Sequence, residues 1–428
     1  MRYTLMLAGL VIVLAGAAAA AAENLSPETL LPAHGETCAF APAVAFGKDT
    51  YLVVWQADCS EKADMVGVRL DKSGKALDAK PFVICAAKDS QSGAFVTFGA
   101  GVFLVVWQDL RNEKDWDVYA ARVSPDGKVL DPDGILVGGG PLNQSAPTAC
   151  FDGQDFLVLY ANQLNERRIE KGEHPLTNPD IHVFGARLSA EGRPAGAPVL
   201  AAKPPPNGWW FNRDLGSPGV VKVGDGPVLA GAVKSGQWTA FWNVADLKTP
   251  EKPVTTSSRF VLSGPRFATD GRNVLAVWST FCVSPGRTSG SLNTGMLFFP
   301  DGNPAKVPAD QLGGKDGKEP GRSLSGTPID GRLQVRNPSP AWDGKSYVVA
   351  WDITMQRGFR YDVVLMRRVS ASGEPDGKDE PVAGEPESPA LRPAVASDGA
   401  GTTVIAYERH PRTPETPVKI GVRVLTAK

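Results

Sequence analysis

The chain has 428 residues, of which 42% are hydrophobic, and a formal net charge of −1. It can therefore bury a large core, but it lacks the charge excess that drives binding to nucleic acid or to an anionic membrane. No stretch after residue 22 approaches the roughly 18 apolar residues of a membrane-spanning helix, so we expect no membrane insertion.

Residues 1–22 have the parts of a signal peptide. Arg2 supplies positive charge, Leu5 to Leu14 form an apolar segment, and a run of alanines offers an A-x-A cleavage site near Ala22. We therefore expect the mature chain, residues 23–428, to be exported to the periplasm or the extracellular space. No cysteine lies directly after the apolar segment, at the expected cleavage site, which argues against lipid attachment of the bacterial lipoprotein kind.

One phrase recurs along the mature chain. Its clearest copies are PAVAFGKDTYLVVW (Pro42 to Trp55), PTACFDGQDFLVLY (Pro147 to Tyr160), PRFATDGRNVLAVW (Pro265 to Trp278) and PSPAWDGKSYVVAW (Pro338 to Trp351). Each copy has two apolar runs separated by a turn with Gly near its centre, which predicts a β-hairpin.

A second phrase follows each hairpin, as in MVGVRLDKSGKALDAKPFVI from Met65. An arginine precedes the turn glycine of this phrase by five residues in four copies, at Arg69, Arg122, Arg187 and Arg368. We expect these arginines to bridge neighbouring strands, a structural role. Two hairpins per period of about 50 residues give a four-stranded unit that needs neighbours on both sides, which predicts a β-propeller.

The number of blades follows from the aromatic residue that closes each hairpin. These closing aromatics, which we expect to pack between blades, are Trp55, Trp107, Tyr160, Trp278, Trp351 and Tyr407. A degenerate copy, PGVVKVGDGPVLAG from Pro218, fills the gap after Tyr160. We expect one all-β domain over residues 23–428, a propeller of seven four-stranded blades, with six blades as the alternative. The last repeat has only three strands, and Leu25 to Ala33 should complete it as the outer strand.

The two phrases resemble a broad group of exported bacterial repeat β-propeller proteins, in which Pro-Ala-Val-Ala-x-Asp-Gly…Leu-Val-Val-Trp alternates with Asp-Ile-x-x-x-Arg-Val-Ser-x-x-Gly. The resemblance covers almost all of residues 24–428. It implies the fold and export but no general activity, so no functional residue can be carried over from it.

The five cysteines all lie in the mature chain, where an oxidising compartment allows disulfides. Cys38 and Cys59 flank the first hairpin, and the fold of that hairpin brings them opposite each other, so we predict a disulfide between them. The pairing of Cys85, Cys150 and Cys282 stays open, although Cys150 lies in a predicted inner strand and should be buried. Their spacing matches no zinc site, and we expect no metal and no cofactor.

Two long loops hold the candidate ligand-binding residues. The loop at 202–216 places Trp209, Trp210 and Phe211 beside Asn207 and Arg213, a flat apolar platform with hydrogen-bonding groups that suits a sugar ring or a peptide side chain. The alternative is that these aromatics fill the gap beside the degenerate blade.

The loop at 161–180 contains Arg167 and His174 among other charged residues. A histidine beside carboxylates can act as a general base, but a solvated charged insertion explains this loop equally well. These two residues complete the set of candidate binding residues.

A further candidate set directly follows the closing aromatics: Gln56, Gln108, Ala161, Ser279, Asp352 and Glu408. Such a set could face the channel mouth and bind water, a cation or a polar ligand. Its few acidic members are thin support for calcium.

No pattern in the sequence specifies a nucleophile or a catalytic set, so we name no catalytic residue and favour a non-catalytic role, with enzymatic activity left open. The expected function is binding of an envelope or extracellular protein or a glycan through the long-loop face, by a monomer. One alternative is a propeller glycoside hydrolase or polysaccharide lyase, with two carboxylates converging from different blades. The other is a purely structural envelope component.

Overall fold

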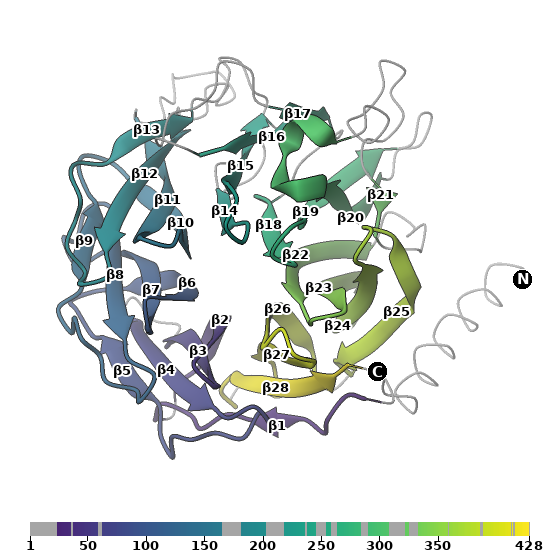
Figure 1. Cartoon of the computed structure of the whole chain (residues 1–428). Coiled ribbons are helices and arrows are strands. Elements are labelled where there is room, and N and C mark those ends of the chain that lie inside the picture. Colours follow the sequence, from purple (N-terminus) through teal and green to yellow (C-terminus); the bar gives the residue numbers. More distant parts are fainter. Residues whose placement is uncertain are drawn as a thin grey trace, which may run out of the picture.

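The computed structural model describes residues 24–427, apart from residues 36, 59–61, 165–180, 203–217, 236–237, 245–253, 258–262, 284–289, 308–321, 325–332, 358, 386–387, 412 and 414–415. Within the described residues, the strands form seven four-stranded antiparallel sheets, arranged as blades around a central axis (Figure 1). The predicted seven-bladed all-β propeller is therefore confirmed, and the six-bladed alternative is wrong.

We number the blades along the chain and give their strands from the inside outward. Blade 1 has β2 (Ala39–Gly47), β3 (Thr50–Ala57), β4 (Asp64–Leu70) and β5 (Phe82–Cys85), and blade 2 has β6 (Gln91–Gly99), β7 (Val102–Asp109), β8 (Asp117–Val123) and β9 (Ile135–Gly138). Blade 3 has β10 (Gln144–Phe151), β11 (Asp155–Gln163), β12 (Ile181–Ser189) and β13 (Val199–Ala202), and blade 4 has β14 (Gly219–Lys222), β15 (Val228–Ser235), β16 (Trp238–Asn243) and β17 (Val254–Ser257).

Blade 5 has β18 (Arg266–Thr269), β19 (Val274–Val283), β20 (Gly290–Phe299) and β21 (Arg322–Ser323), with the short 3₁₀ helices η1 (Pro300–Gly302) and η2 (Pro304–Lys306) after β20. Blade 6 has β22 (Leu333–Trp342), β23 (Ser346–Arg357), β24 (Phe359–Ser370) and β25 (Pro375–Ala383). Blade 7 has β26 (Ala390–Ser397), β27 (Thr402–Arg409), β28 (Lys419–Thr426) and, as its outer strand, β1 (Thr29–Leu30). Among the described helices, none is long and apolar enough to cross a membrane.

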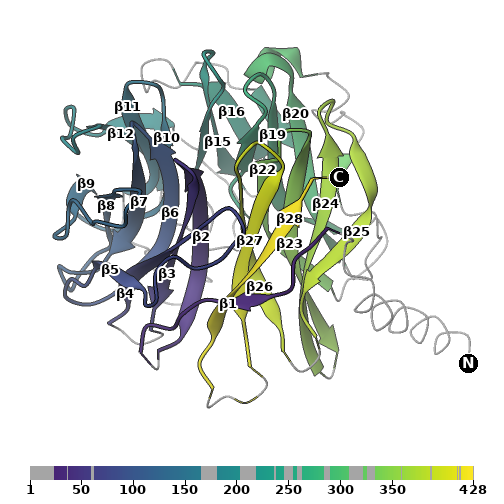
Figure 2. The same ribbon diagram turned by 60° about the horizontal axis from the view of Figure 1, so that its bottom comes forward.

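The N-terminal strand closes the ring, as expected for Leu25 to Ala33. Thr29 pairs with Val422 in β28, and Leu25 bridges to Leu425. Figure 2 shows β1 running alongside β28. The Tyr407 hydroxyl donates a hydrogen bond of 2.7 Å to Glu28 Oε1, which ties the closing aromatic of blade 7 to this strand. The strand covers an edge that would otherwise be open.

The degenerate fourth repeat forms a true blade. Its second strand has Ala232 at the position of the closing aromatic, and the third strand supplies Trp242 in its place. Both are buried in one cluster at the interface of blades 3 and 4. The large side chain has therefore moved to the neighbouring strand while the interface remains filled.

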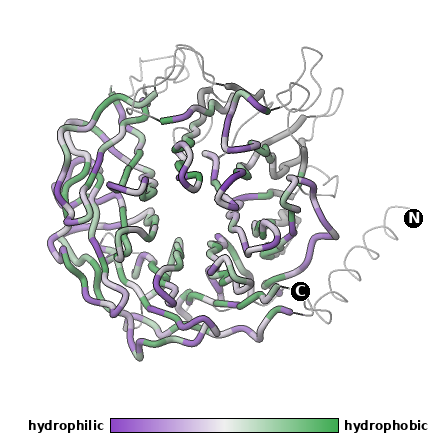
Figure 3. The backbone as a smooth tube through the Cα atoms, viewed as in Figure 1, coloured by the Kyte–Doolittle hydropathy of each residue, from purple (hydrophilic) through white to green (hydrophobic). Residues whose placement is uncertain are grey.

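The core consists of the interfaces between blades. The buried apolar residues of the described chain fall into seven clusters, and each cluster lies between two neighbouring blades. Apolar stretches accordingly recur around the ring (Figure 3). Trp55, Trp107, Trp278 and Trp351 are all at most 1% exposed, in agreement with their predicted packing role.

The repeated arginines bridge strands as predicted. Arg69 binds Asp78 and donates from Nη1 to the Pro125 carbonyl of blade 2, at 3.1 Å. Arg122 binds Asp131 and reaches a carbonyl of blade 3 in the same way. In blades 3 and 6 the corresponding ion pairs stay within one blade and are Arg187–Asp152 and Arg368–Asp343.

A β-bulge near the start of the inner strand recurs in five blades. One residue of each bulge has a left-handed backbone, and these residues are Ala41, Gly93, Ala146, Asn337 and Arg392, with φ between 49° and 65°. Proline follows four of them, and a bulge is one of the few sheet positions that tolerate proline. The bulge turns a backbone N–H away from its own sheet, which matters for the site described next.

Candidate active site between blades 6, 7 and 1

The predicted ligand-binding residues lie outside the described part of the chain. They are Trp209, Trp210, Phe211, Asn207, Arg213, Arg167 and His174. Their role stays a prediction.

The predicted disulfide is not shown. Cys38 is a free thiol, whereas Cys59 is not among the described residues. The Asp58 N–H donates to the Cys38 carbonyl at 2.8 Å, so the two ends of the hairpin are paired as expected. Cys85 and Cys150 are free and buried.

Three residues that directly follow a closing aromatic hold neighbouring blades together. Gln108 Oε1, Asp352 Oδ1 and Glu408 Oε1 accept hydrogen bonds from the bulge N–H groups of Ala146, Arg392 and Ala41, at 3.3, 3.1 and 2.8 Å. We call these three the latch residues. Each one reaches the following blade, and Glu408 links blade 7 back to blade 1. The expectation that this set faces the channel mouth is therefore wrong for Asp352 and Glu408, which are each 1% exposed.

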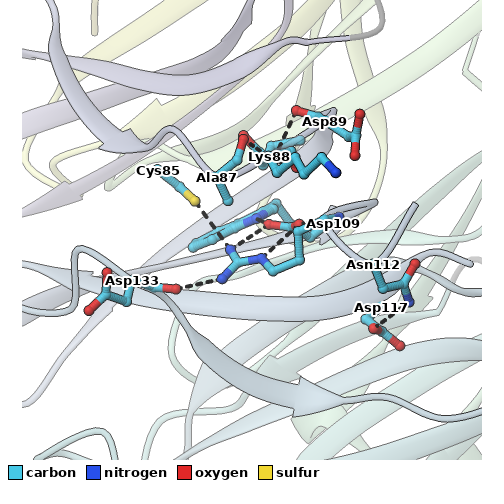
Figure 4. A network of polar contacts seen from close by, with 11 residues as sticks. Cys85, Ala87, Lys88, Asp89, Asp109, Asn112, Asp117 and Asp133 are labelled. Atoms are coloured by element: carbon cyan, nitrogen blue, oxygen red, sulfur yellow. Dashed lines mark hydrogen bonds and ion pairs between the residues drawn. The ribbon is translucent and has the colours of Figure 1, made fainter. Parts of the chain in front are cut away.

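Asp109 in blade 2 is a buried carboxylate whose two oxygens are both occupied by hydrogen bonds from the protein (Figure 4). Its Oδ1 accepts from the backbone N–H and Nε of Arg111, and its Oδ2 accepts from Trp107 Nε1 and Arg111 Nη2, all within 2.7 to 2.9 Å. The guanidinium of Arg111 also stacks on Tyr119, 3.8 Å from the ring centroid. Both oxygens of Asp109 are occupied, so this carboxylate has no role left in chemistry.

Asp352 in β23 is surrounded differently. Its Oδ1 accepts from Asn337 Nδ2 at 2.8 Å as well as from the Arg392 N–H. Its Oδ2 is buried and has no hydrogen-bond partner among the described residues. Burial raises the pKa of Asp352 to about 7, although hydrogen bonds from Asn337 and Arg392 oppose the rise, and the charge of Glu408 adds to it. The carboxyl can therefore carry a proton at neutral pH.

Glu408 in β27 stays ionised. Burial alone would raise its pKa, but hydrogen bonds from His410, Arg392 and the Ala41 N–H outweigh this effect, so the pKa of Glu408 is lowered. His410 Nε2 and Arg392 Nη1 each lie 2.8 Å from its carboxylate oxygens. The result is a buried anion bound by the side chains of an arginine and a histidine.

Arg392 joins the two acidic residues. Its backbone N–H binds Asp352 and its guanidinium binds Glu408, and the side chain is 53% exposed. Because it lies in the bulge of inner strand β26, this arginine lies at the channel end of the pair. A protonated carboxyl and an ionised carboxylate thus lie on neighbouring blades, an arrangement that can donate a proton and stabilise positive charge.

The pattern of residues gave only part of this site in advance. Asp352 and Glu408 belonged to the set after the closing aromatics, but nothing in the sequence indicated that they form a pair or that His410 joins them. The signal that identifies Arg392 and Asn337 is their position before a proline in the inner strand, where the bulge forms. Within the described residues, no group of three or more His, Cys, Asp or Glu side chains could hold a metal.

No protein-family model matches the chain, and no curated protein matches it. Among solved structures, a protein of unknown function from Dyadobacter fermentans DSM 18053 is similar over 95% of this chain and 100% of its own, with 10% identity and a TM-score of 0.51. A thermostable family-43 glycoside hydrolase covers 64% of this chain and 94% of its own, with 18% identity and a TM-score of 0.38. An α-L-arabinofuranosidase from Lactobacillus brevis covers 81% and 96%, with 12% identity and a TM-score of 0.42.

Several similar solved structures bear the names of glycoside hydrolases. The comparisons thus give no support to the expected non-catalytic binding propeller, and these names agree with the hydrolase alternative. At these identities the likeness itself shows only the fold. Any catalytic role has to be argued from the residues of this chain, and the Asp352–Glu408 pair is where such an argument begins.

Proposed function

We propose that the chain is a glycoside hydrolase of propeller fold, with its active site at the channel end of blades 6 and 7. The observation that carries the proposal is the pair Asp352 and Glu408, two buried carboxyl groups on adjacent blades whose pKa values move in opposite directions. Glycoside hydrolysis generally uses two such groups, one protonated and one ionised. The predicted export of the chain would place the enzyme where polysaccharides are met.

In this mechanism Asp352 is the general acid. With its pKa near 7 it holds a proton at neutral pH and can transfer it to the oxygen of the leaving sugar as the glycosidic bond breaks. Glu408 is the ionised partner, which stabilises the positive charge that develops on the sugar ring. A water molecule then attacks the anomeric carbon and gives its proton to the Asp352 carboxylate, which restores the acid. Asn337 is a positioning residue, because its amide fixes the Oδ1 atom of Asp352 and leaves Oδ2 for the proton.

Access to the pair is controlled by Arg392. Its half-exposed guanidinium lies on Glu408, so it has to shift for a sugar to reach the carboxylates. Arg392 contacts Glu408 through its guanidinium and Asp352 through its backbone N–H. The guanidinium can therefore leave Glu408 and bind a substrate while the backbone hydrogen bond to Asp352 stays in place.

The test is release of reducing ends from a panel of oligosaccharides and aryl glycosides between pH 4 and 9. We expect hydrolysis whose rate falls above about pH 7, as Asp352 loses its proton. The pKa of Asp352 is measured in parallel by carboxyl carbon NMR. A panel without turnover, together with an Asp352 that titrates near the ordinary aspartate value, would contradict the proposal.

A further inference from the structure

Phe40 is an aromatic side chain that lies outside the packed core. It is the second residue of β2 in blade 1 and is half-buried. Within the described chain, it belongs to none of the seven core clusters and is not among the partly buried residues packed against them. Phe46, at the other end of the same strand, packs by contrast against a core cluster, and its ring centroid lies 4.8 Å from that of Tyr51. The core therefore does not account for an aromatic residue at position 40.

The ring of His410 lies beside that of Phe40. The two centroids are 6.2 Å apart, and the rings are tilted by 58°. His410 directly follows β27 of blade 7, so the contact crosses the junction at which the last blade meets the first. Figure 1 shows β2 beside β26 and β27 at this junction. Residues from nearly opposite ends of the chain thus form one small surface.

Glu408 holds both sides of this surface in place. Its Oε2 atom lies 2.8 Å from His410 Nε2, and its Oε1 atom accepts from the N–H of Ala41, the residue after Phe40, at 2.8 Å. The backbone of His410 is fixed as well, because its N–H donates to the Pro389 carbonyl at 2.9 Å. The two rings are therefore positioned by the fold before a ligand arrives, which reduces the entropy lost on binding.

The bond to Glu408 also determines what His410 can offer to a ligand. Because Glu408 is ionised, its oxygens only accept hydrogen bonds, so the Nε2 atom of His410 carries the hydrogen. In the neutral imidazole, Nδ1 is then an acceptor. The His410 side chain is 27% exposed, and Nδ1 has no hydrogen-bond partner among the described residues. A hydroxyl group that approaches this nitrogen can donate to it.

An aromatic ring next to such an acceptor suits a sugar. The aromatic face binds apolar surface in a flat contact, and the acceptor fixes the orientation of the ligand through a directed hydrogen bond. A pyranose ring in its chair form offers both, because C–H groups gather on one face while hydroxyl groups point outward around the edge. A furanose ring is smaller and puckered and has substituents on both faces, so it makes a poorer contact with a flat ring.

We infer that Phe40 and His410 form a subsite for a pyranose, with a C–H face of the sugar packed on the Phe40 ring and one hydroxyl group donating to His410 Nδ1. The inference rests on the proposed function in so far as the held sugar is the one that reacts. Because the subsite adjoins Glu408, the sugar held there is the ring on which positive charge develops, and the leaving sugar lies toward Asp352. Phe40 and His410 determine which sugar is accepted, and neither takes part in the proton transfer.

The experiment measures binding of neutral trisaccharides to the full chain, by saturation-transfer NMR and, for the sugars that bind, by calorimetry. The pyranose set is cellotriose, mannotriose, xylotriose and galactotriose, and the furanose probe is the trimer of arabinofuranose. We expect at least one pyranose trisaccharide to bind about fivefold or more tightly than the furanose trimer. Equal or tighter binding of the furanose trimer, or no binding of any pyranose trisaccharide, would overturn the inference.

Variants of both residues test their roles. Phe40→Leu removes the flat ring and should weaken binding of the best pyranose about threefold to tenfold, whereas Phe40→Tyr keeps the ring and should bind like the natural chain. Phe46→Leu is the matched control, because it makes the same change at the other end of β2, and it should leave the affinity unchanged. His410→Gln keeps a donor for Glu408 but places no acceptor at the position of Nδ1. It should therefore retain the fold by circular dichroism and weaken binding about threefold to tenfold.

The same variants separate the subsite from the proposed function. If Phe40→Leu and His410→Gln bind the pyranose like Phe46→Leu, the subsite is wrong, and continued cleavage of the sugar by these variants would leave the hydrolase standing. Pyranose binding that depends on Phe40 but is followed by no cleavage would support the subsite and count against the hydrolase. The two failures are therefore distinguishable.

Discussion

Asp109 in blade 2 and Asp352 in blade 6 are both buried carboxyl groups near a closing tryptophan, yet their surroundings differ completely. Asp109 lies two residues after Trp107, on the same face of its strand, and Asp352 lies one residue after Trp351, on the opposite face. The first therefore meets Trp107 Nε1 and Arg111, which occupy both oxygens. The second meets the next blade, and one of its oxygens has no partner among the described residues.

The difference shows how a buried carboxyl group can serve either the fold or the chemistry of a site. A carboxylate with every lone pair satisfied contributes to the fold and resists change. A buried carboxyl with one oxygen that lacks a hydrogen-bond partner has a raised pKa. It therefore still carries a proton near pH 7 and can donate it. A shift of a single residue along the strand is enough to change one role into the other.

The largest effect should come from removing the proposed acid. Asp352→Asn should lower turnover by about 10²- to 10⁴-fold, the usual contribution of general acid catalysis, because the amide cannot donate the proton and become an anion. Reducing-end assays on the best substrate of the panel measure this. Asp131→Asn, in the ion pair with Arg122 on the outer side of blade 2, is the matched control and should keep full turnover. Equal loss in both variants would mean that the effect is structural.

The next effect concerns stability. Asp109→Asn should reduce the free energy of unfolding by about 3–5 kcal/mol, because it leaves Arg111 without its anion in a partly buried site. Asp352→Asn should change it by less than about 1 kcal/mol at pH 6, where the native carboxyl is already protonated. Urea unfolding followed by tryptophan fluorescence measures both variants. Similar losses in the two would break the comparison.

The pH dependence of stability sharpens the same contrast. Because the pKa of Asp352 is raised from 3.8 to about 7 in the fold, its contribution is fully present below pH 4 and is lost as the pH rises toward 7, at up to about 1.4 kcal/mol per pH unit. Glu408 has a lowered pKa, so its contribution has the opposite sign and is lost only as the pH falls below about 4.

Unfolding of the natural chain and of Asp352→Asn should therefore be compared between pH 5 and 8. The natural chain should lose stability relative to the variant over this range. Two parallel curves would show that Asp352 does not titrate there.

The smallest effect is expected at a neutral latch. Gln108→Ala removes a hydrogen bond to the Ala146 N–H and another to Ser92, and it should cost about 1 kcal/mol of unfolding free energy. Glu408→Gln keeps an acceptor for the Ala41 N–H but loses the charge that holds Arg392, so its cost should be larger, about 1.5–3 kcal/mol. Thermal unfolding of both variants tests the order, and the reverse order would show that the charge of Glu408 adds nothing to the latch.

The fold could be predicted from the sequence because every repeat contains the apolar runs and the turn residues that form its own hairpins. Even the degenerate fourth copy kept the turn and spacing that form β14 and β15, and the strand that completes blade 7 was recognisable. The bridging role of Arg69 and Arg122 also followed from their fixed distance to a turn.

The candidate site could not be derived in the same way. The link between Asp352 and Arg392 depends on a left-handed backbone in a bulge, which is a property of three-dimensional pairing rather than of composition. Glu408 and Asp352 lie on different blades and meet only around the ring. The residues that did attract attention, such as Trp209 and Trp210, lie in a loop outside the described residues.

The closure of blade 7 has a consequence for how the protein is made. Thr29, near the beginning of the chain, finds its partner Val422 only when nearly the whole chain has been synthesised. Until then β1 is an unpaired strand, and any product that stops early exposes an edge that can pair with another molecule. The ring can therefore close only late in biogenesis, and the first strand remains open to pairing with other molecules until the last strand has been synthesised.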